Sequence, residues 1–150
     1  MSGEYFFDTT VLIYAVAQND PRAATAEELL ANGGTVSIQV LNEFVSVARR
    51  KLRMPWENIV EALAAVRVLC AAPVAITVDT HDAALRIAQR YGFHIYDSLI
   101  VAAAIEAGCT TLYSEDMQHN QTIGSLTVRN PFRSSKVRRS LNLRKPAPPQ

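Results

Sequence analysis

The sequence predicts an α/β protein with a mainly parallel central sheet. Short runs of aromatic and β-branched residues alternate along the chain with longer segments whose apolar residues recur every three or four positions. Asparagine, glycine and proline stand between these segments, where turns are needed. This alternation of strand and helix is typical of parallel sheets, because successive parallel strands need a long crossover connection.

The first half of the chain is expected to contain two strands and four helices. The aromatic run Tyr5-Phe6-Phe7 predicts the first strand, and apolar side chains recur at helical spacing from Ile38 onward. Pro55 breaks that helix and can open the next one. The expected strands are residues 5–7 and 35–37, and the expected helices are residues 9–18, 23–31, 38–52 and 55–70.

The second half is expected to contain three strands and two helices. A β-branched run after Pro73 predicts a strand, and Gly92 ends the amphipathic helix that follows. The last expected helix is apolar on nearly all sides, so it should be buried. The expected strands are residues 74–78, 110–113 and 126–128, and the expected helices are residues 80–91 and 97–107.

The charge distribution divides the chain into an acidic body and a basic end. A chain of 150 residues suits one domain, which we expect to span residues 1–132. Residues 1–116 carry 14 acidic and 8 basic residues, a net charge of −6, whereas residues 117–150 carry 7 basic residues and no acid. Residues 133–150 are basic and finally proline-rich, which predicts a disordered tail.

Several classes of protein are excluded by what the sequence lacks. No signal peptide is visible, and the longest near-apolar stretch, Leu99–Ile105, is too short to span a bilayer, so we expect a cytoplasmic protein without membrane contact. The two cysteines, Cys70 and Cys109, are expected to be buried thiols rather than a disulfide. No CxxC or paired-histidine spacing indicates a zinc site.

Common catalytic motifs are also missing. The chain has no phosphate-binding P-loop, no GxGxxG and no GxSxG. Its histidines share no spacing that would suggest a joint role. An enzyme that forms a phosphoaspartate could use Asp8, but such enzymes expect a second aspartate two residues later, where this chain has Thr10.

Four acidic residues stand out by their positions. They are Asp8 after the first strand, Glu43 within a helix, Asp97 at the start of the buried helix and Asp116 after the strand 110–113. Because the carboxyl ends of parallel strands share one edge of a sheet, Asp8 and Asp116 are expected to lie near each other. Carboxylate oxygens suit Mg²⁺ or Mn²⁺. A cluster of carboxylates is tolerable mainly around a cation, or with raised pKa values.

Each of these residues also has a structural alternative. Asp8 and Asp97 could be helix N-caps, and Glu43 could be an ion-pair partner on a helix surface. Three other acidic residues compete for membership of the cluster, and composition does not rank them: Asp79, Asp82 and Glu115. The pattern alone therefore makes a metal site a hypothesis that needs further support.

Five segments in order along the chain form a recognisable set: Phe6–Leu12, Ser37–Phe44, Tyr96–Ala104, Tyr113–Met117 and the ending Asn130–Phe132. Together they resemble the PIN-domain family, in which the first metal-binding aspartate closes the first strand, and the ending resembles that of VapC-like members. Each motif alone is weak, but the ordered set is specific, and it covers residues 4–132. Thr10 departs mildly from the family, which usually has asparagine or serine there.

The resemblance implies a PIN-like three-layer α/β/α sandwich and an endoribonuclease site. It makes Asp8, Glu43, Asp97 and Asp116 the catalytic and metal-binding acids, with Asp116 preferred to Glu115 because the family pattern is Ser/Thr-x-Asp. Thr9 and Ser114 fall where the family has supporting polar residues. One or two Mg²⁺ or Mn²⁺ ions would assist hydrolysis of RNA, leaving a 5′-phosphate and a 3′-hydroxyl.

The resemblance also implies partners. VapC-like members are toxins of type II toxin–antitoxin systems, so a VapB-like antitoxin, an RNA substrate and a homodimer are expected. The alternative is a PIN-fold module that has lost catalysis and only binds RNA or a protein; the presence of all four acids favours the enzyme.

Basic residues near the predicted site suggest where RNA could be held. Four of them cluster at the end of the Glu43 helix: Arg49, Arg50, Lys51 and Arg53. They could instead only complement the helix C-terminus. The basic tail could engage RNA phosphates, lie across the acidic body, or have no role.

Overall fold

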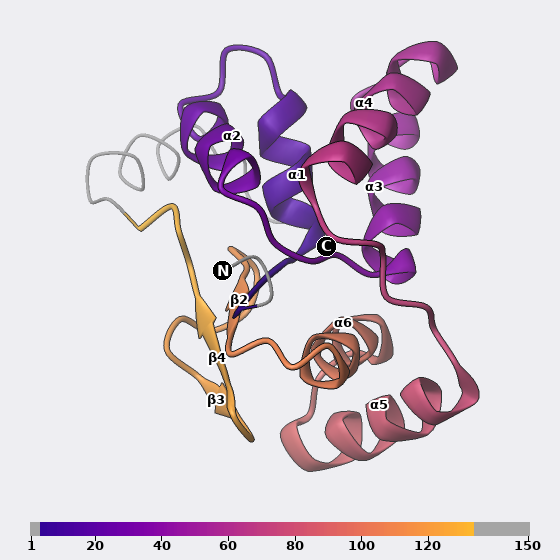
Figure 1. The fold of residues 1–150 in the computed structure, drawn as a ribbon, viewed down its shortest axis with the longest axis vertical. Helices are drawn as coiled ribbons and strands as arrows, with labels where there is room; N and C mark the ends of the chain where they lie inside the picture. The colour runs from indigo at the N-terminus through magenta and orange to yellow at the C-terminus, as the bar shows by residue number, and fades with distance from the viewer. Residues whose placement is uncertain (1–3, 134–150) are drawn as a thin grey trace, which may run out of the picture.

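The computed structural model describes residues 4–133 of the chain. These residues contain six helices and four strands (Figure 1). The helices are α1 (Thr9–Val16), α2 (Ala23–Ala31), α3 (Ile38–Arg50), α4 (Trp56–Leu69), α5 (Val78–Tyr91) and α6 (Ile95–Glu106). The strands are β1 (Tyr5–Phe7), β2 (Thr111–Tyr113), β3 (Thr122–Ile123) and β4 (Leu126–Arg129). A tail is expected at residues 133–150, and only Arg133 of it belongs to the described residues.

The sheet is mainly parallel and has the strand order β1-β2-β4-β3. β1 pairs with β2 and β2 with β4 in parallel, whereas the short β3 returns antiparallel to β4. Isolated parallel bridges place Thr35 beside Phe6 of β1, and Val74 beside Ser37. Because β1 and β2 run in the same direction, the residues that follow them, Asp8 and Ser114, emerge at the same edge of the sheet.

The helices form two groups, one made of α1 to α4 and the other of the packed pair α5 and α6 (Figure 1). Residues 98–104 of α6 are all buried, as its apolar sequence predicts. Apolar side chains from the sheet and from both helix groups join in one core that includes Phe6, Phe44, Ile100 and Leu112. The expected α/β class with a mainly parallel sheet and helices in outer layers is confirmed.

Two predicted strands are wrong in extent. Residues 35–37 and 74–78 form only single bridges, at Thr35, Ser37 and Val74. The second run fails as a strand because Thr77 caps α5: its hydroxyl accepts from the Thr80 amide at 3.1 Å, while the Thr80 hydroxyl accepts from the Thr77 amide at 3.2 Å. This reciprocal cap starts the helix within the β-branched run. The two-residue strand β3 was not predicted.

Of the two capping alternatives raised for the acids, the one for Asp8 holds and the one for Asp97 does not. Asp8 is the N-cap of α1, and its Oδ1 accepts from the Thr9 amide at 2.6 Å. Asp97 does not cap α6, because the helix begins earlier, with His94 as its N-cap. The carboxylate of Asp97 is therefore not engaged in capping and projects from the first turn.

Three further features bear on the sequence expectations. Cys70 and Cys109 are free and buried, as predicted. Between residues 4 and 133, no helix combines the length and apolarity that crossing a membrane requires. Gly34 allows its own backbone to approach Phe7 closely, because a Cβ at this position would lie 2.5 Å from the Phe7 ring.

Candidate active site

Asp8 is the buried centre of the predicted site. Its side chain is only 4% exposed, and both of its oxygens accept hydrogen bonds. Oδ1 accepts from the Thr9 amide, and Oδ2 accepts from the Ser114 hydroxyl at 2.6 Å. Ser114 also accepts from the Met117 amide at 3.2 Å, so it ties the turn after β2 to the end of β1. These bonds hold the Asp8 carboxylate in a single orientation.

Glu43 comes from α3 and is half-buried. Its Oε1 accepts from the Thr9 hydroxyl at 3.1 Å, and its Oε2 accepts from Gln39, one turn earlier on the same helix, at 2.8 Å. Thr9 thus donates its amide to Asp8 and its hydroxyl to Glu43. One residue therefore positions two of the predicted acids relative to each other.

All four predicted acids line one cavity of about 340 Å³. Asp97 reaches it from the first turn of α6, and the exposed Asp116 reaches it from the turn after β2. Lys51, beyond the end of α3, lines the same cavity. Asp79 and Asp82, which competed for membership on sequence grounds, are not among the lining residues. We call this space the acid cavity.

Burial and mutual repulsion disfavour negative charge in the acid cavity. Burial raises the pKa of Asp8 to about 7, against the opposing effect of its bonds from Ser114 and Thr9, and the charges of Asp116 and Asp97 add to the rise. Burial also raises the pKa of Asp97, as do the charges of Glu43 and Asp116. The acids therefore interact electrostatically, and a cation among them would favour their ionised forms.

The donor set fits a hard divalent cation, although the side chains are not gathered around a single point. Carboxylate oxygens are the preferred ligands of Mg²⁺ and Mn²⁺. Among residues 4–133, no three histidine, cysteine, aspartate or glutamate side chains lie close enough together to hold one ion. The bonds from Thr9 and Gln39 hold both oxygens of Glu43. Ligation by three of the acids would therefore require a side-chain rearrangement.

A second network, which the sequence analysis did not find, fixes the turn that carries Asp116. Arg22 donates to both oxygens of Glu115 at 3.0 Å and forms an ion pair with Asp20 at 2.9 Å. Its guanidinium lies 3.6 Å from the centre of the Tyr14 ring, and the Tyr14 hydroxyl is hydrogen-bonded to Glu115. Glu115 is thus a positioning residue. Because Tyr14 and Glu115 lie about 100 residues apart in the chain, no local sequence pattern reveals their contact.

Thr10, the residue that departs from the family pattern, also supports this turn. Its hydroxyl accepts from the Glu115 amide at 3.2 Å. It therefore links the start of α1 to the residue before Asp116. The substitution keeps a hydrogen-bonding side chain where the family has asparagine or serine.

The basic cluster after Glu43 does not act as a unit. Lys51 lines the acid cavity, whereas Arg50 lines a second, polar cavity beside it. Arg49 donates to the Met54 carbonyl at 2.9 Å and lies 5.0 Å from the centre of the Trp56 ring. Two of the four basic side chains therefore border cavities that also contain the predicted acids.

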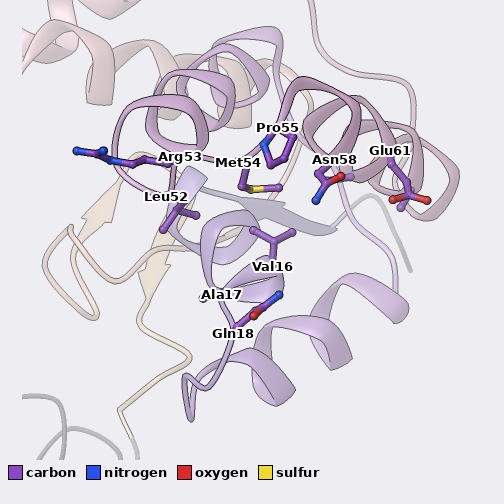
Figure 2. A pocket seen from close by; sticks show the side chains of 11 residues that line it. Val16, Ala17, Gln18, Leu52, Arg53, Met54, Pro55, Asn58 and Glu61 are labelled. Carbon is purple, nitrogen blue, oxygen red and sulfur yellow. The ribbon is translucent and has the colours of Figure 1, made fainter.

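A third hollow lies between α1 and α4, and most of its lining side chains are small or apolar. Four polar or charged side chains also line it: Gln18, Arg53, Asn58 and Glu61. It measures about 620 Å³, and Val16 and Met54 lie near its centre while the Arg53 side chain extends away (Figure 2). A smaller cavity of about 190 Å³ continues from it toward α2 and shares Val16, Ala62 and Ala65 with it. We call the two together the apolar groove.

These features define an α/β domain whose acidic site lies at the carboxyl edge of a mainly parallel sheet. The family model described as the PIN domain matches residues 5–123. The chain belongs to the PIN domain family, which confirms the resemblance inferred from the motifs. No curated protein sequence matches the chain significantly.

Solved structures of bacterial toxins share this fold. VapC20 of Mycobacterium tuberculosis, described as a Sarcin-Ricin loop cleaving toxin, is 24% identical over 75% of this chain and 90% of its own, with a TM-score of 0.63. A toxin–antitoxin complex from Klebsiella pneumoniae is 17% identical over 86% and 98% of the two chains, with a TM-score of 0.66. VapBC2 of Rickettsia felis, bound to a DNA fragment from its promoter, is 20% identical over 84% and 97%, with a TM-score of 0.60.

Proposed function

We propose that this protein is a metal-dependent endoribonuclease that acts as the toxin of a VapBC-type toxin–antitoxin pair in the cytoplasm. The observation that carries the proposal is the acid cavity, where four carboxylates from separate segments of a PIN domain line one space. The description of VapC20 as a Sarcin-Ricin loop cleaving toxin supports the choice of RNA as the substrate.

The four acids would hold Mg²⁺ or Mn²⁺, which supplies an activated water and compensates charge on the scissile phosphate. Ser114 and the Thr9 amide orient Asp8, and the Thr9 hydroxyl and Gln39 orient Glu43. Asp97, from α6, and Asp116, from the turn after β2, line the same cavity. Lys51 provides a cation at the same cavity for the anionic backbone of the substrate.

Cleavage of a single-stranded RNA in Mg²⁺ or Mn²⁺ tests this function. We expect products with a 5′-phosphate and a 3′-hydroxyl, loss of cleavage in EDTA, and loss in the Asp8→Asn and Asp97→Asn variants. Glu106→Gln, whose parent carboxylate accepts from Thr80 far from the acid cavity, is the matched control and should cleave normally. RNA binding without cleavage under all of these conditions would favour the inactive binding module instead.

The apolar groove supports the proposal of a protein partner. Two of the structures with this fold contain a toxin with its antitoxin. The small side chains of Ala62 and Ala65 leave a hollow beside Val16 in which apolar side chains of an antitoxin segment could be buried. Co-purification with the product of the adjacent short open reading frame is the test, and failure to form a complex would contradict this part of the proposal.

Two further proposals do not depend on the acid cavity: the homodimer rests on the family resemblance alone, whereas RNA contact by the tail rests on its positive charge. We propose a homodimer, which light scattering at micromolar concentration tests, and a monomer would contradict it. We also propose that the basic residues after 133 contact RNA. Each neutralised phosphate of a single strand contributes a slope of about −0.7 to the salt dependence of affinity. Deletion of residues 134–150 in an inactive variant should reduce that slope, and an unchanged slope would contradict RNA contact by the tail.

A further inference from the structure

A polar groove of about 600 Å³ opens directly onto the acid cavity. The two share Glu43, Val47 and Asp97, so a ligand held at the acids extends naturally into this groove. Tyr96 and His94, at the start of α6, form one wall, and Arg50, from the end of α3, lies on the other. We call this space the side groove.

Tyr96 is an exposed aromatic side chain beside a predicted catalytic acid. It is 54% exposed, although residues 98–104 of the same helix are all buried. Its amide donates to Nδ1 of His94 at 3.2 Å, and the two rings lie 5.1 Å apart with a tilt of 48°. The core therefore does not require this ring, and the histidine holds the backbone that presents it.

Arg50 supplies the positive charge of the side groove. Its Nε donates to the hydroxyl of Ser46, one turn earlier on α3, at 3.1 Å, and this bond orients the guanidinium. Among residues 4–133, the structure pairs Arg50 with no carboxylate. A planar guanidinium with free terminal nitrogens is suited to phosphate oxygens.

We propose that the side groove binds the nucleotide next to the scissile phosphate of single-stranded RNA, with its base stacked on Tyr96 and its phosphate contacted by Arg50. This inference rests on the proposed ribonuclease function. The position of the charges fixes the orientation: Asp97 and Glu43 next to Tyr96 repel phosphate, whereas the uncharged face of a base can lie on the ring. The phosphate therefore lies toward Arg50.

Affinity for RNA in an inactive background tests the stacking contact. The probe is a fluorescein-labelled single-stranded RNA of mixed sequence, and the full chain carries Asp8→Asn so that the RNA persists. Stacking on an aromatic side chain is worth about 5-fold to 150-fold in affinity per base. We expect Tyr96→Leu to weaken binding at least about 5-fold, and Tyr96→Phe and Tyr96→Trp to bind within about 2-fold of the parent.

Further measurements test the phosphate contact of Arg50 and the stacking contact of Tyr96 separately. Arg50→Gln should lower the slope of log affinity against log salt by about 0.7, whereas Tyr96→Leu should leave the slope unchanged. A 2-aminopurine base in the RNA should change its fluorescence on binding to the parent and lose that change in Tyr96→Leu. Trp56→Leu and Arg67→Gln are the matched controls, since both side chains are exposed and lie outside the side groove.

The outcomes separate this inference from the proposed function. If wild type cleaves RNA but Tyr96→Leu binds within about 2-fold of the parent, base stacking is overturned while the ribonuclease stands. If Tyr96→Leu weakens capture of the adjacent open reading frame's product and leaves RNA affinity unchanged, the side groove serves a protein and the inference is overturned. If wild type neither binds nor cleaves RNA, the proposed function itself fails, and this inference fails with it.

Discussion

The acid cavity and the apolar groove lie side by side and both include Leu52 among their lining residues, yet they are built in opposite ways. The acid cavity contains five charged side chains, and hydrogen bonds from Thr9 and Ser114 set the positions of two of them, Asp8 and Glu43. Within the described part of the chain, no side-chain hydrogen bond joins two residues that line the apolar groove, and its shape follows from the small side chains of Ala62 and Ala65.

This difference in construction predicts which substitutions each region tolerates. Carboxylates act at defined positions, so removing one charge or one orienting donor should affect chemistry more than folding. A groove bounded by alanines depends on empty volume, so a larger or charged side chain there should affect association more than chemistry. The two regions should therefore respond to different substitutions, and the following predictions test that separation.

The largest expected effect is on cleavage. Asp97→Asn should reduce the rate at least about 100-fold, more than the 10- to 100-fold typical of residues that support a metal ligand. Asparagine preserves the volume of the side chain but removes the negative charge that a cation requires. Asp97 does not cap α6, so folding should be retained, which circular dichroism can verify. Cleavage at the wild-type rate would exclude Asp97 from the site.

Removal of an orienting donor should have the next largest effect. Ser114→Ala deletes the 2.6 Å hydrogen bond to Asp8, and we expect cleavage to fall about 10- to 100-fold with a higher requirement for Mg²⁺. The metal titration distinguishes a positioning role from a loss of folded protein. Ser125→Ala, in the exposed turn between β3 and β4, is the matched control. An unchanged metal requirement would show that Asp8 does not depend on Ser114.

The apolar groove should respond in the opposite way. Ala65→Glu places a charge in the groove, and we expect affinity for the product of the adjacent open reading frame to fall about 10-fold or more. Cleavage by the isolated chain should not change, because Ala65 is absent from the acid cavity. Ala64→Glu, exposed on the same helix but outside the groove, is the control. Equal effects of the two substitutions would contradict the assigned surface.

The smallest expected effect is a pH-dependent gain in stability. The pKa of Asp8 is about 7 in the folded chain and 3.8 in an unfolded one, so the ionised carboxylate lowers the stability of the fold. This cost is complete above pH 7, declines as pH falls from 7 towards 3.8, and is absent below 3.8. In EDTA near pH 8, Asp8→Asn should raise the free energy of unfolding by about 1 kcal/mol or more. Urea denaturation should find that the gain shrinks as pH falls below 7 and is lost only as pH falls to about 3.8. A gain independent of pH would contradict the assignment.

Much of the fold was predictable because its information is local. Apolar spacing identified the helices, and the apolar run in the middle of α6 predicted its burial. Element ends were less predictable, because capping depends on single side chains. His94 starts α6 before Asp97, and the Thr77–Thr80 cap converts the end of a β-branched run into helix.

By itself, the sequence determined the order and spacing of the acidic motifs, and a parallel sheet then brings the residues after β1 and β2 to one edge. Only the tertiary structure decided what surrounds those acids. The contacts of Arg22 and Tyr14 with Glu115, and the opening of the acid cavity into the groove beside Tyr96, join residues from distant parts of the chain. Such contacts depend on how helices pack rather than on any repeating pattern, so no local periodicity records them.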